Sequence, residues 1–185
     1  MQNYSDRNEM VRSLCKEGQI GAEIGVFTGD FSEILLSTSP KKLFLIDCWV
    51  KQEGEYTRDG TNNVVDGNLY SQVVQKFKDD PRVIIWRMFS DEACNHFTDN
   101  YFDWIYLDAD HTYASAMKDL KNWLPKVKIG GLFLGHDYFT TDCIDVEAAV
   151  NKFFGKSNID ILTIENFAPS WGIIKKIKKR VLKYI

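Results

Sequence analysis

The chain has 185 residues, of which 44% are hydrophobic and 14% aromatic, and its formal net charge is -3. This composition is typical of a globular domain with one sizeable core, and the net charge argues against an electrostatic nucleic-acid binder. No apolar run approaches the roughly 18 residues that span a bilayer, and the polar start MQNYSDRNEM lacks the pattern of a secretory signal. We therefore expect a single cytoplasmic domain over residues 1–185 with no transmembrane segment.

The cysteines are widely spaced and form no CxxC pair: Cys15, Cys48, Cys94 and Cys143. This spacing argues against a zinc knuckle or a thioredoxin-type motif. It predicts reduced, mostly buried thiols, as expected for a cytoplasmic protein.

Helices and strands are predicted to alternate along the chain. Ser5 can cap a first helix over about 5–17, which Gly18 ends, within an N-terminal segment of residues 1–19. Buried strands are predicted at 20–26, 42–50, 82–90, 102–110 and 132–138. Helices are predicted at 28–39, 68–80, 91–97, 113–127 and 145–154, a turn at 128–131, and two last strands at 160–166 and 170–176.

This alternation predicts a Rossmann-like α/β fold. Right-handed βαβ crossovers give a mostly parallel sheet with helices on both faces, and the two adjacent strands at the end predict a hairpin with one antiparallel strand. Ligands of such sheets bind outside the carboxyl ends of the strands, so we expect the chemistry there.

Polar and acidic residues gather at these predicted strand ends, namely EIGVFTG at 23–29, Asp47, Phe89-Ser90, Asp108 to His111, and His136-Asp137. An aspartate at one strand end is commonly only a turn or capping residue. Five strand ends that agree favour a binding crevice.

The first of these turns has Gly25 and Gly29, but Phe27 stands where a dinucleotide fingerprint has its second glycine. That glycine lets the backbone approach a pyrophosphate, so its loss argues against an NAD-linked oxidoreductase. Glu23 supplies a carboxylate beside the turn, and Asp47, at the end of the second strand, can accept the hydroxyl protons of a ribose. A ribose without phosphate and an amino-acid-like cation describe S-adenosylmethionine (SAM).

The segments AEIGVFTGDFS, LFLIDCW, DWIYLDADHTY and GGLFLGHDYF resemble the successive motifs of class I SAM-dependent methyltransferases, and most closely those of the small methyltransferase family 24. The resemblance covers residues 20–175 approximately and implies a seven-stranded sheet whose last strand is antiparallel. The cofactor-binding residues expected from it are Glu23, Gly25, Val26, Gly29, Asp47, Cys48, Ser90 and Asp108, with Ser90 near the adenine.

Metal-dependent O-methyltransferases of related architecture have a metal carboxylate at the end of the matching strand and an acid–amide pair after the next one. By that resemblance, Asp108, His136 and Asp137 are candidate ligands of one divalent cation, magnesium or manganese. Two oxygen ligands and an imidazole suit manganese, iron or zinc better than magnesium. The alternative is that Asp108 binds only the cofactor amine and Asp137 caps the next helix. His111 is the candidate general base, or else a surface residue in a first helical turn, and Asp110 can orient it or cap the following helix.

Two polar segments are candidates for other contacts. The stretch 50–68 is long enough to be a lid over the site, with Tyr56, Arg58 and Asp59 as candidate substrate contacts, or else a surface loop. The basic tail, residues 175–185, can be a solvated end or a contact in a homo-oligomer.

The leading hypothesis is thus a SAM-dependent methyltransferase that O-methylates a small hydroxylated, sugar-like molecule. We expect no nucleic-acid partner, because the chain has no added recognition domain. The alternatives are a catalytically inactive module that binds SAM or S-adenosylhomocysteine (SAH) and, with less support, the NAD-linked oxidoreductase.

Overall fold

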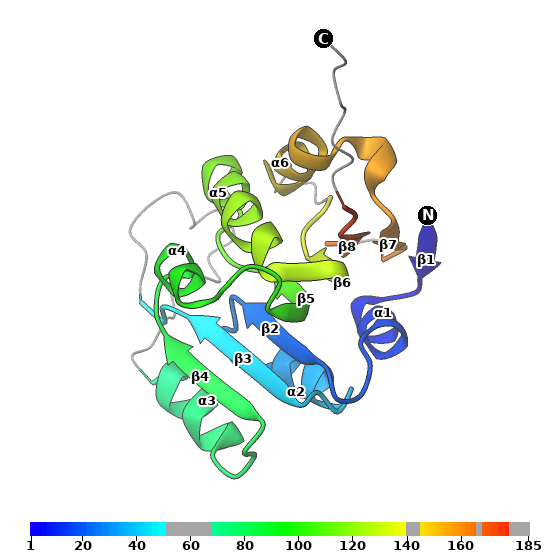
Figure 1. Ribbon diagram of the computed structural model, residues 1–185. Coiled ribbons are helices and arrows are strands. Elements are labelled where there is room, and N and C mark those ends of the chain that lie inside the picture. Colours follow the sequence, from blue (N-terminus) through cyan, green and yellow to red (C-terminus); the bar gives the residue numbers. More distant parts are fainter. Residues whose placement is uncertain (51–67, 140–144, 166–167, 178–185) are drawn as a thin grey trace.

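The structure, a computed structural model, describes residues 1–50, 68–139, 145–165 and 168–177 (Figure 1). Its centre is an eight-stranded sheet in the order β1-β7-β8-β6-β5-β2-β3-β4. Strand β8 is antiparallel to its neighbours β6 and β7, and the other paired strands are parallel. The strands are β1 (Gln2–Tyr4), β2 (Ile20–Ile24), β3 (Lys42–Asp47), β4 (Val83–Arg87), β5 (Phe102–Leu107), β6 (Val127–Gly135), β7 (Ile161–Thr163) and β8 (Trp171–Ile174).

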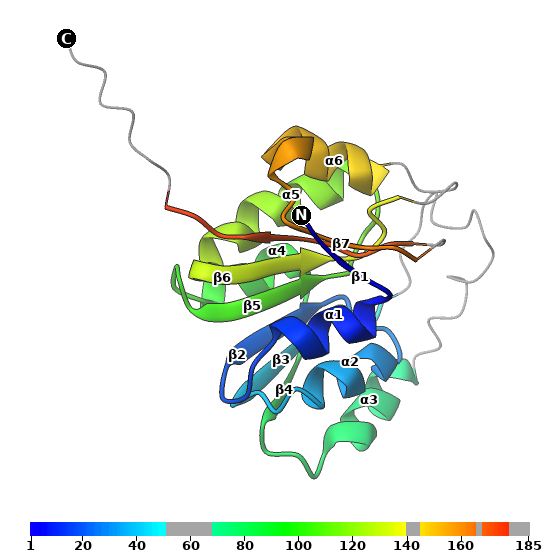
Figure 2. The same ribbon diagram turned by 90° about the vertical axis from the view of Figure 1, so that its right-hand side faces the viewer.

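Helices cover both faces of the sheet, as Figure 2 shows from the side. One layer consists of α1 (Arg7–Leu14), α2 (Asp30–Leu36) and α3 (Leu69–Phe77). The other consists of α4 (Ser90–Ala93), α5 (Tyr113–Trp123) and α6 (Asp145–Phe154), with 3-10 turns η2 (Cys94–His96), η3 (Leu124–Lys126) and η4 (Lys156–Asn158). None of the helices in the described ranges is long and apolar enough to cross a membrane.

The two-sided core explains why the strands read as continuous apolar runs. In β3, Leu43 and Leu45 pack in the cluster under α1 to α3, and Phe44 and Ile46 pack in the cluster under α4 to α6. All four are 5% exposed or less. Successive side chains of a strand point to opposite faces, so a strand with helices on both sides must be apolar throughout.

The predicted fold class is confirmed, but the count of seven strands is wrong. Strand β1 was missed because its sequence, Gln-Asn-Tyr, is short and polar; it pairs in parallel with β7, where Gln2 is opposite Ile161. The predicted turn at 128–131 is also wrong, since these residues belong to β6. There the pairing with β5 shifts register, and Gly130 adopts a left-handed φ of +80° that lets the strand bulge.

The first helix begins and ends inside its predicted bounds. Asp6, and not Ser5, caps α1: its Oδ1 accepts a hydrogen bond of 2.8 Å from the Glu9 N–H. Ser5 lies one residue earlier, and its own N–H donates to Glu9 Oε2 at 2.7 Å. The helix ends at Leu14, before the predicted stop at Gly18.

Backbone hydrogen bonds continue the sheet beyond the carboxyl ends of the strands and fix the turns there. The Gly25 N–H donates to Ile46 O at 2.9 Å, the Asp108 N–H to Ile24 O at 2.7 Å, and the His136 N–H to Leu107 O at 3.1 Å. The residues after β2, β5 and β6 are thereby held at one edge of the sheet. Some predictions lie outside the described residues, namely those for Tyr56, Arg58, Asp59, Cys143 and residues 178–185 of the tail.

Candidate cofactor and substrate site

A cavity of about 720 Å³ lies at the carboxyl ends of β2, β3, β4 and β5. Its volume is within the range of sites for small organic ligands. Most of the side chains predicted for the cofactor and for catalysis line this cavity: Glu23, Gly25, Val26, Asp47, Cys48, Ser90, Asp108 and His111. Gly29, His136 and Asp137 do not line it.

Glycine is required in the turn after β2 for two different reasons. Gly25 has a φ of +89°, and a Cβ there would lie 1.9 Å from the backbone oxygen of Asp108, so no side chain fits between the ends of β2 and β5. Gly29 has a φ of +74° and precedes α2, where its N–H donates to Val26 O at 2.9 Å. A Cβ at Gly29 would meet Phe77 of α3 at 3.0 Å, so this glycine shapes the turn and packs against the neighbouring helix.

Asp47 holds the turns after β2 and β3 together. Its Oδ2 accepts hydrogen bonds from the N–H groups of Val26 at 2.8 Å and Phe27 at 3.0 Å. Its Oδ1 accepts from the Trp49 N–H at 2.7 Å. A carboxylate has about four acceptor positions, so three are used for the protein's own backbone and about one is left for a ligand hydroxyl.

Left-handed backbone conformations occur where these strands end. Phe27 after β2, Trp49 after β3 and Asp137 after β6 have φ values of 52°, 43° and 54°. Such conformations are unfavourable for residues other than glycine and cluster where a binding site constrains the chain. Two of the three, Phe27 and Trp49, donate their backbone N–H groups to the carboxylate of Asp47.

Glu23 is buried at the end of β2, with 2% of its surface exposed. The hydroxyl of Ser32 donates a hydrogen bond to its Oε2. Burial raises the pKa of Glu23 well above its usual range, although the hydrogen bond from Ser32 opposes this effect. Burial thus shifts this carboxyl group toward its neutral form, and Glu23 stays a predicted partner of the cofactor.

Ser90 belongs to a hydrogen-bonded network that sequence reasoning did not find. Its hydroxyl donates to Asp119 Oδ1 and accepts from the Trp123 indole N–H at 2.8 Å. Burial raises the pKa of Asp119 to about 6, although the hydrogen bond from Ser90 opposes it. The sequence did contain a sign of this network. Asp119 lies on the buried face of α5 with Ala116, Leu120 and Trp123, where the helical pattern otherwise has apolar residues.

The ends of β5 and β6 bring two acids and two histidines together. His111 Nε2 lies 3.4 Å from Asp108 Oδ1 and 3.0 Å from Asp137 Oδ2. His136 Nδ1 lies 3.2 Å from Asp137 Oδ2 and 3.8 Å from Asp108 Oδ1. Among the described residues, Asp108, His111 and Asp137 form a group that could hold a metal ion, because their ligand atoms all lie within 4.8 Å of one another. His111 thus takes the place in this group that the sequence suggested for His136.

The paired acids set the charge of His111. Burial alone lowers the pKa of His111, but the hydrogen bond to Asp108 and the charge of Asp137 outweigh it and raise the pKa to about 9. Burial of Asp137 raises the pKa of that carboxyl, whereas the contacts with His136 and His111 bring it below its usual range. Asp110, expected to orient His111 or cap α5, accepts a hydrogen bond from the Thr112 N–H, and Thr112 itself caps the helix.

Arg7 is a further residue of the cavity wall that the sequence did not indicate. It begins α1, and its Nη1 lies 3.5 Å from Asp108 Oδ2. The two residues are separated by 101 positions in the chain, so no local pattern could have linked them.

Comparisons with known proteins identify the family of this chain and agree on its fold. Residues 19–138 match methyltransferase family 24, described as a methyltransferase domain. No curated protein matches the sequence at a significant level. Among solved structures, a candidate methyltransferase from Streptococcus mutans in complex with SAH is 13% identical, with a TM-score of 0.63 over 91% of this chain and 94% of that chain.

Two other solved structures have the same fold. An rRNA methylase from Streptococcus thermophilus is 9% identical, with a TM-score of 0.63 over 92% of this chain and 94% of that chain. Spermidine synthase from Thermotoga maritima is 17% identical, with a TM-score of 0.58 over 94% of this chain and 58% of that chain.

The sheet order, the cavity at the strand ends and the family match define a SAM-dependent methyltransferase with a Rossmann-like fold. The chain belongs to methyltransferase family 24.

Proposed function

We propose that the protein transfers the methyl group of SAM to a hydroxyl group of a small, sugar-like molecule. The observation that carries this proposal is the convergence of His111, Asp108 and Asp137 at the ends of β5 and β6, beside the cavity. A polar cluster with an imidazole is suited to activating a hydroxyl group. The net charge of -3 favours a small molecule over the polyanionic substrate of an rRNA methylase.

The cofactor supplies an electrophilic methyl group on a sulfonium. During transfer the substrate oxygen forms a C–O bond as the C–S bond breaks, and the hydroxyl proton must leave. His111 Nε2 is the group proposed to take that proton. With a pKa of about 9 it is neutral in only about one molecule in a hundred at pH 7, so as a free base it acts best in alkaline solution.

A divalent cation, magnesium or manganese, fits the same donors. Two carboxylate oxygens and an imidazole nitrogen within 4.8 Å of one another are suited to such an ion, which would lower the pKa of a bound substrate hydroxyl. In this arrangement His111 Nε2 is a ligand and cannot also accept the proton. The set expected from sequence, Asp108, His136 and Asp137, would leave His111 as the base.

The pH dependence of turnover with and without EDTA tests these arrangements. The assay measures SAH release with a panel of monosaccharides and polyols from pH 6 to 10. If His111 acts alone, EDTA has no effect, the rate rises with an apparent pKa near 9, and His111→Ala lowers turnover by about 10²–10⁴-fold. If the cation is required, EDTA abolishes turnover, added magnesium or manganese restores it, and Asp137→Asn mimics EDTA while SAH binding is retained.

Full activity in both His111→Ala and Asp137→Asn would refute a chemical role for this cluster.

The second candidate function is a SAM- or SAH-binding module without catalysis. This function is favoured by the pairing of His111 with two carboxylates, which keeps the imidazole protonated near neutral pH, because a protonated imidazole cannot accept the hydroxyl proton. Calorimetric binding of SAH without turnover on any member of the panel would support that module. Binding of NAD with no response to SAH would support the oxidoreductase instead.

A further inference from the structure

Arg7 is held at the cavity wall by contacts at both ends of the residue. Its backbone N–H donates a hydrogen bond to the side chain of Glu165, just after β7, which fixes the start of α1. Its guanidinium carbon lies 4.4 Å from the centre of the Phe31 ring, in the first turn of α2. The side chain is 33% exposed and lines the cavity, so its charged end is accessible to a ligand.

The guanidinium of Arg7 has capacity for a second anion. Its contact with Asp108 Oδ2, at 3.5 Å, is longer than the 2.7–2.9 Å typical of strong charged hydrogen bonds. The hydroxyl of Tyr106 is another neighbour of the guanidinium, and it also forms a hydrogen bond of 2.8 Å with the hydroxyl of Ser170. A guanidinium has five N–H donors in a planar fork that matches a carboxylate, so these contacts use only part of its capacity.

The charges beside Arg7 are complementary to a zwitterion. The amino-acid end of SAM has an ammonium group next to a carboxylate, and binding both requires an anion next to a cation. Arg7 and Asp108 are such a pair. Glu23 does not offset Arg7 in the same way, because burial favours its neutral form and Ser32 is bonded to it.

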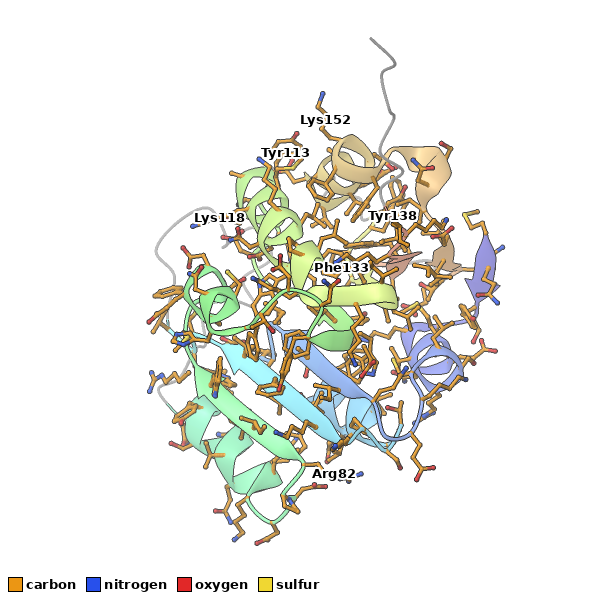
Figure 3. The ribbon with its side chains drawn as sticks, in the orientation of Figure 1. Arg82, Tyr113, Lys118, Phe133, Tyr138 and Lys152 are labelled. Carbon is orange, nitrogen blue, oxygen red and sulfur yellow. The ribbon has the colours of Figure 1, made fainter. Side chains whose placement is uncertain are left out.

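Among the described residues that line the cavity, Lys118 is the other lysine or arginine, and it lies on α5. It projects from α5 toward α4 (Figure 3), where its Nζ pairs with Asp91 Oδ2 at 2.6 Å. It is on the side of Ser90, where we expect the adenine. Of these two side chains, Arg7 is therefore the one placed for the amino-acid end.

We propose that Arg7 is a specificity-determining residue that binds the carboxylate of the amino-acid end of SAM, while Asp108 Oδ2 binds the neighbouring ammonium. The inference rests on the assignment of this cavity to SAM. It predicts that the protein distinguishes ligands that have this carboxylate from ligands that lack it.

The test compares the binding of SAH with that of S-adenosyl-3-thiopropylamine, which is SAH without its carboxylate. Isothermal titration calorimetry on the full chain should give an affinity for SAH about 10- to 100-fold higher, the range for a charge-assisted hydrogen bond. Arg7→Met keeps an unbranched stem over Phe31 but removes the charge, so the ratio of the two affinities should fall to near one. Arg7→Lys, which keeps the charge without the fork, should retain part of the ratio.

Arg12→Met is the matched control, because Arg12 is an exposed residue in the last turn of the same helix. It should keep the full ratio, and a thermal melt of each variant checks that α1 still packs. An unchanged ratio in Arg7→Met would overturn the proposal, even if both affinities fell, because a purely structural residue affects both ligands alike. Equal binding of both ligands by the wild type would overturn it while leaving the cofactor site intact. Binding of neither ligand would reject the cofactor site itself.

Discussion

Replacing Asp47 should destabilise the protein as well as weaken cofactor binding. The Asp47→Ala variant removes the acceptor of three backbone N–H groups, which belong to Val26, Phe27 and Trp49. Val26 and Trp49 are 5% and 4% exposed, whereas Phe27 is 52% exposed and its N–H can be hydrated instead. The hydrogen bonds of Val26 and Trp49 are partly buried, so each donor left without its partner costs up to about 1–3 kcal/mol, and together they lower the free energy of unfolding by up to about 2–6 kcal/mol.

Urea denaturation measures this loss, and calorimetry with SAH measures the accompanying loss of affinity. Asp80→Ala is the control. Asp80 accepts the Arg82 N–H at 3.0 Å and pairs with its guanidinium at 2.6 Å. This pair lies before the start of β4, near which Figure 3 labels Arg82, and neither residue lines the cavity. This partly exposed pair should contribute less than about 1 kcal/mol. A free energy of unfolding for Asp47→Ala within about 0.5 kcal/mol of the wild type would refute the role of Asp47 in holding the two turns.

Two further substitutions test the site. Gly25→Ala should abolish SAH binding and lower the melting temperature far more than the control Gly18→Ala. Both glycines have a left-handed φ, but only a Cβ at Gly25 meets a backbone oxygen, at 1.9 Å. Equal effects of the two substitutions in thermal melts would contradict this. Asp119→Asn should become more stable relative to the wild type as pH rises from about 4 to above 6. The folded wild type holds a proton that its unfolded chain has lost in this window, so its stability falls there by up to about 3 kcal/mol for a pKa raised to about 6. Urea denaturation at pH 4 and 8 would reject this reasoning if the difference between variant and wild type stayed constant.

The sequence was sufficient for the fold because the local signals and the tertiary packing agree. The strand β3 is apolar on both faces, and the sheet has helices on both faces. The helix α6 has its predicted bounds, Asp145–Phe154. The misses occur where pairing overrides composition: β1 has no apolar residue in its first two positions and exists because β7 offers it backbone partners. Lys128 to Gly131 read as a turn, but the bulge beside β5 accommodates them within β6.

The candidate site was predictable as far as it depends on strand ends. The sheet topology alone places Asp47 and Asp108 at one cavity, and the glycine spacing identifies the turn after β2. Both histidines lie beside the two acids, and the sequence could not predict that His111 Nε2 comes closer to each of them than His136 Nδ1 does, because His111 and His136 both follow strand ends and only the packed side chains distinguish them. The place of Arg7 at the cavity could not be predicted either, because it depends on the packing of α1 against α2, and no residue in the motifs indicates that packing.

The two oxygens of Asp108 connect the two halves of the proposed site. Oδ2 faces Arg7 and the region expected for the amino-acid end of the cofactor, and Oδ1 faces His111 and His136. A strand that ends on this residue can therefore position the methyl donor and the activating group from one rigid point, as methyl transfer requires. The same geometry means that a substitution of Asp108 alters both functions together. Arg7 contacts Asp108 on the cofactor side, and Asp137 contacts His111 on the other side. Variants of these two residues therefore separate cofactor recognition from activation of the substrate.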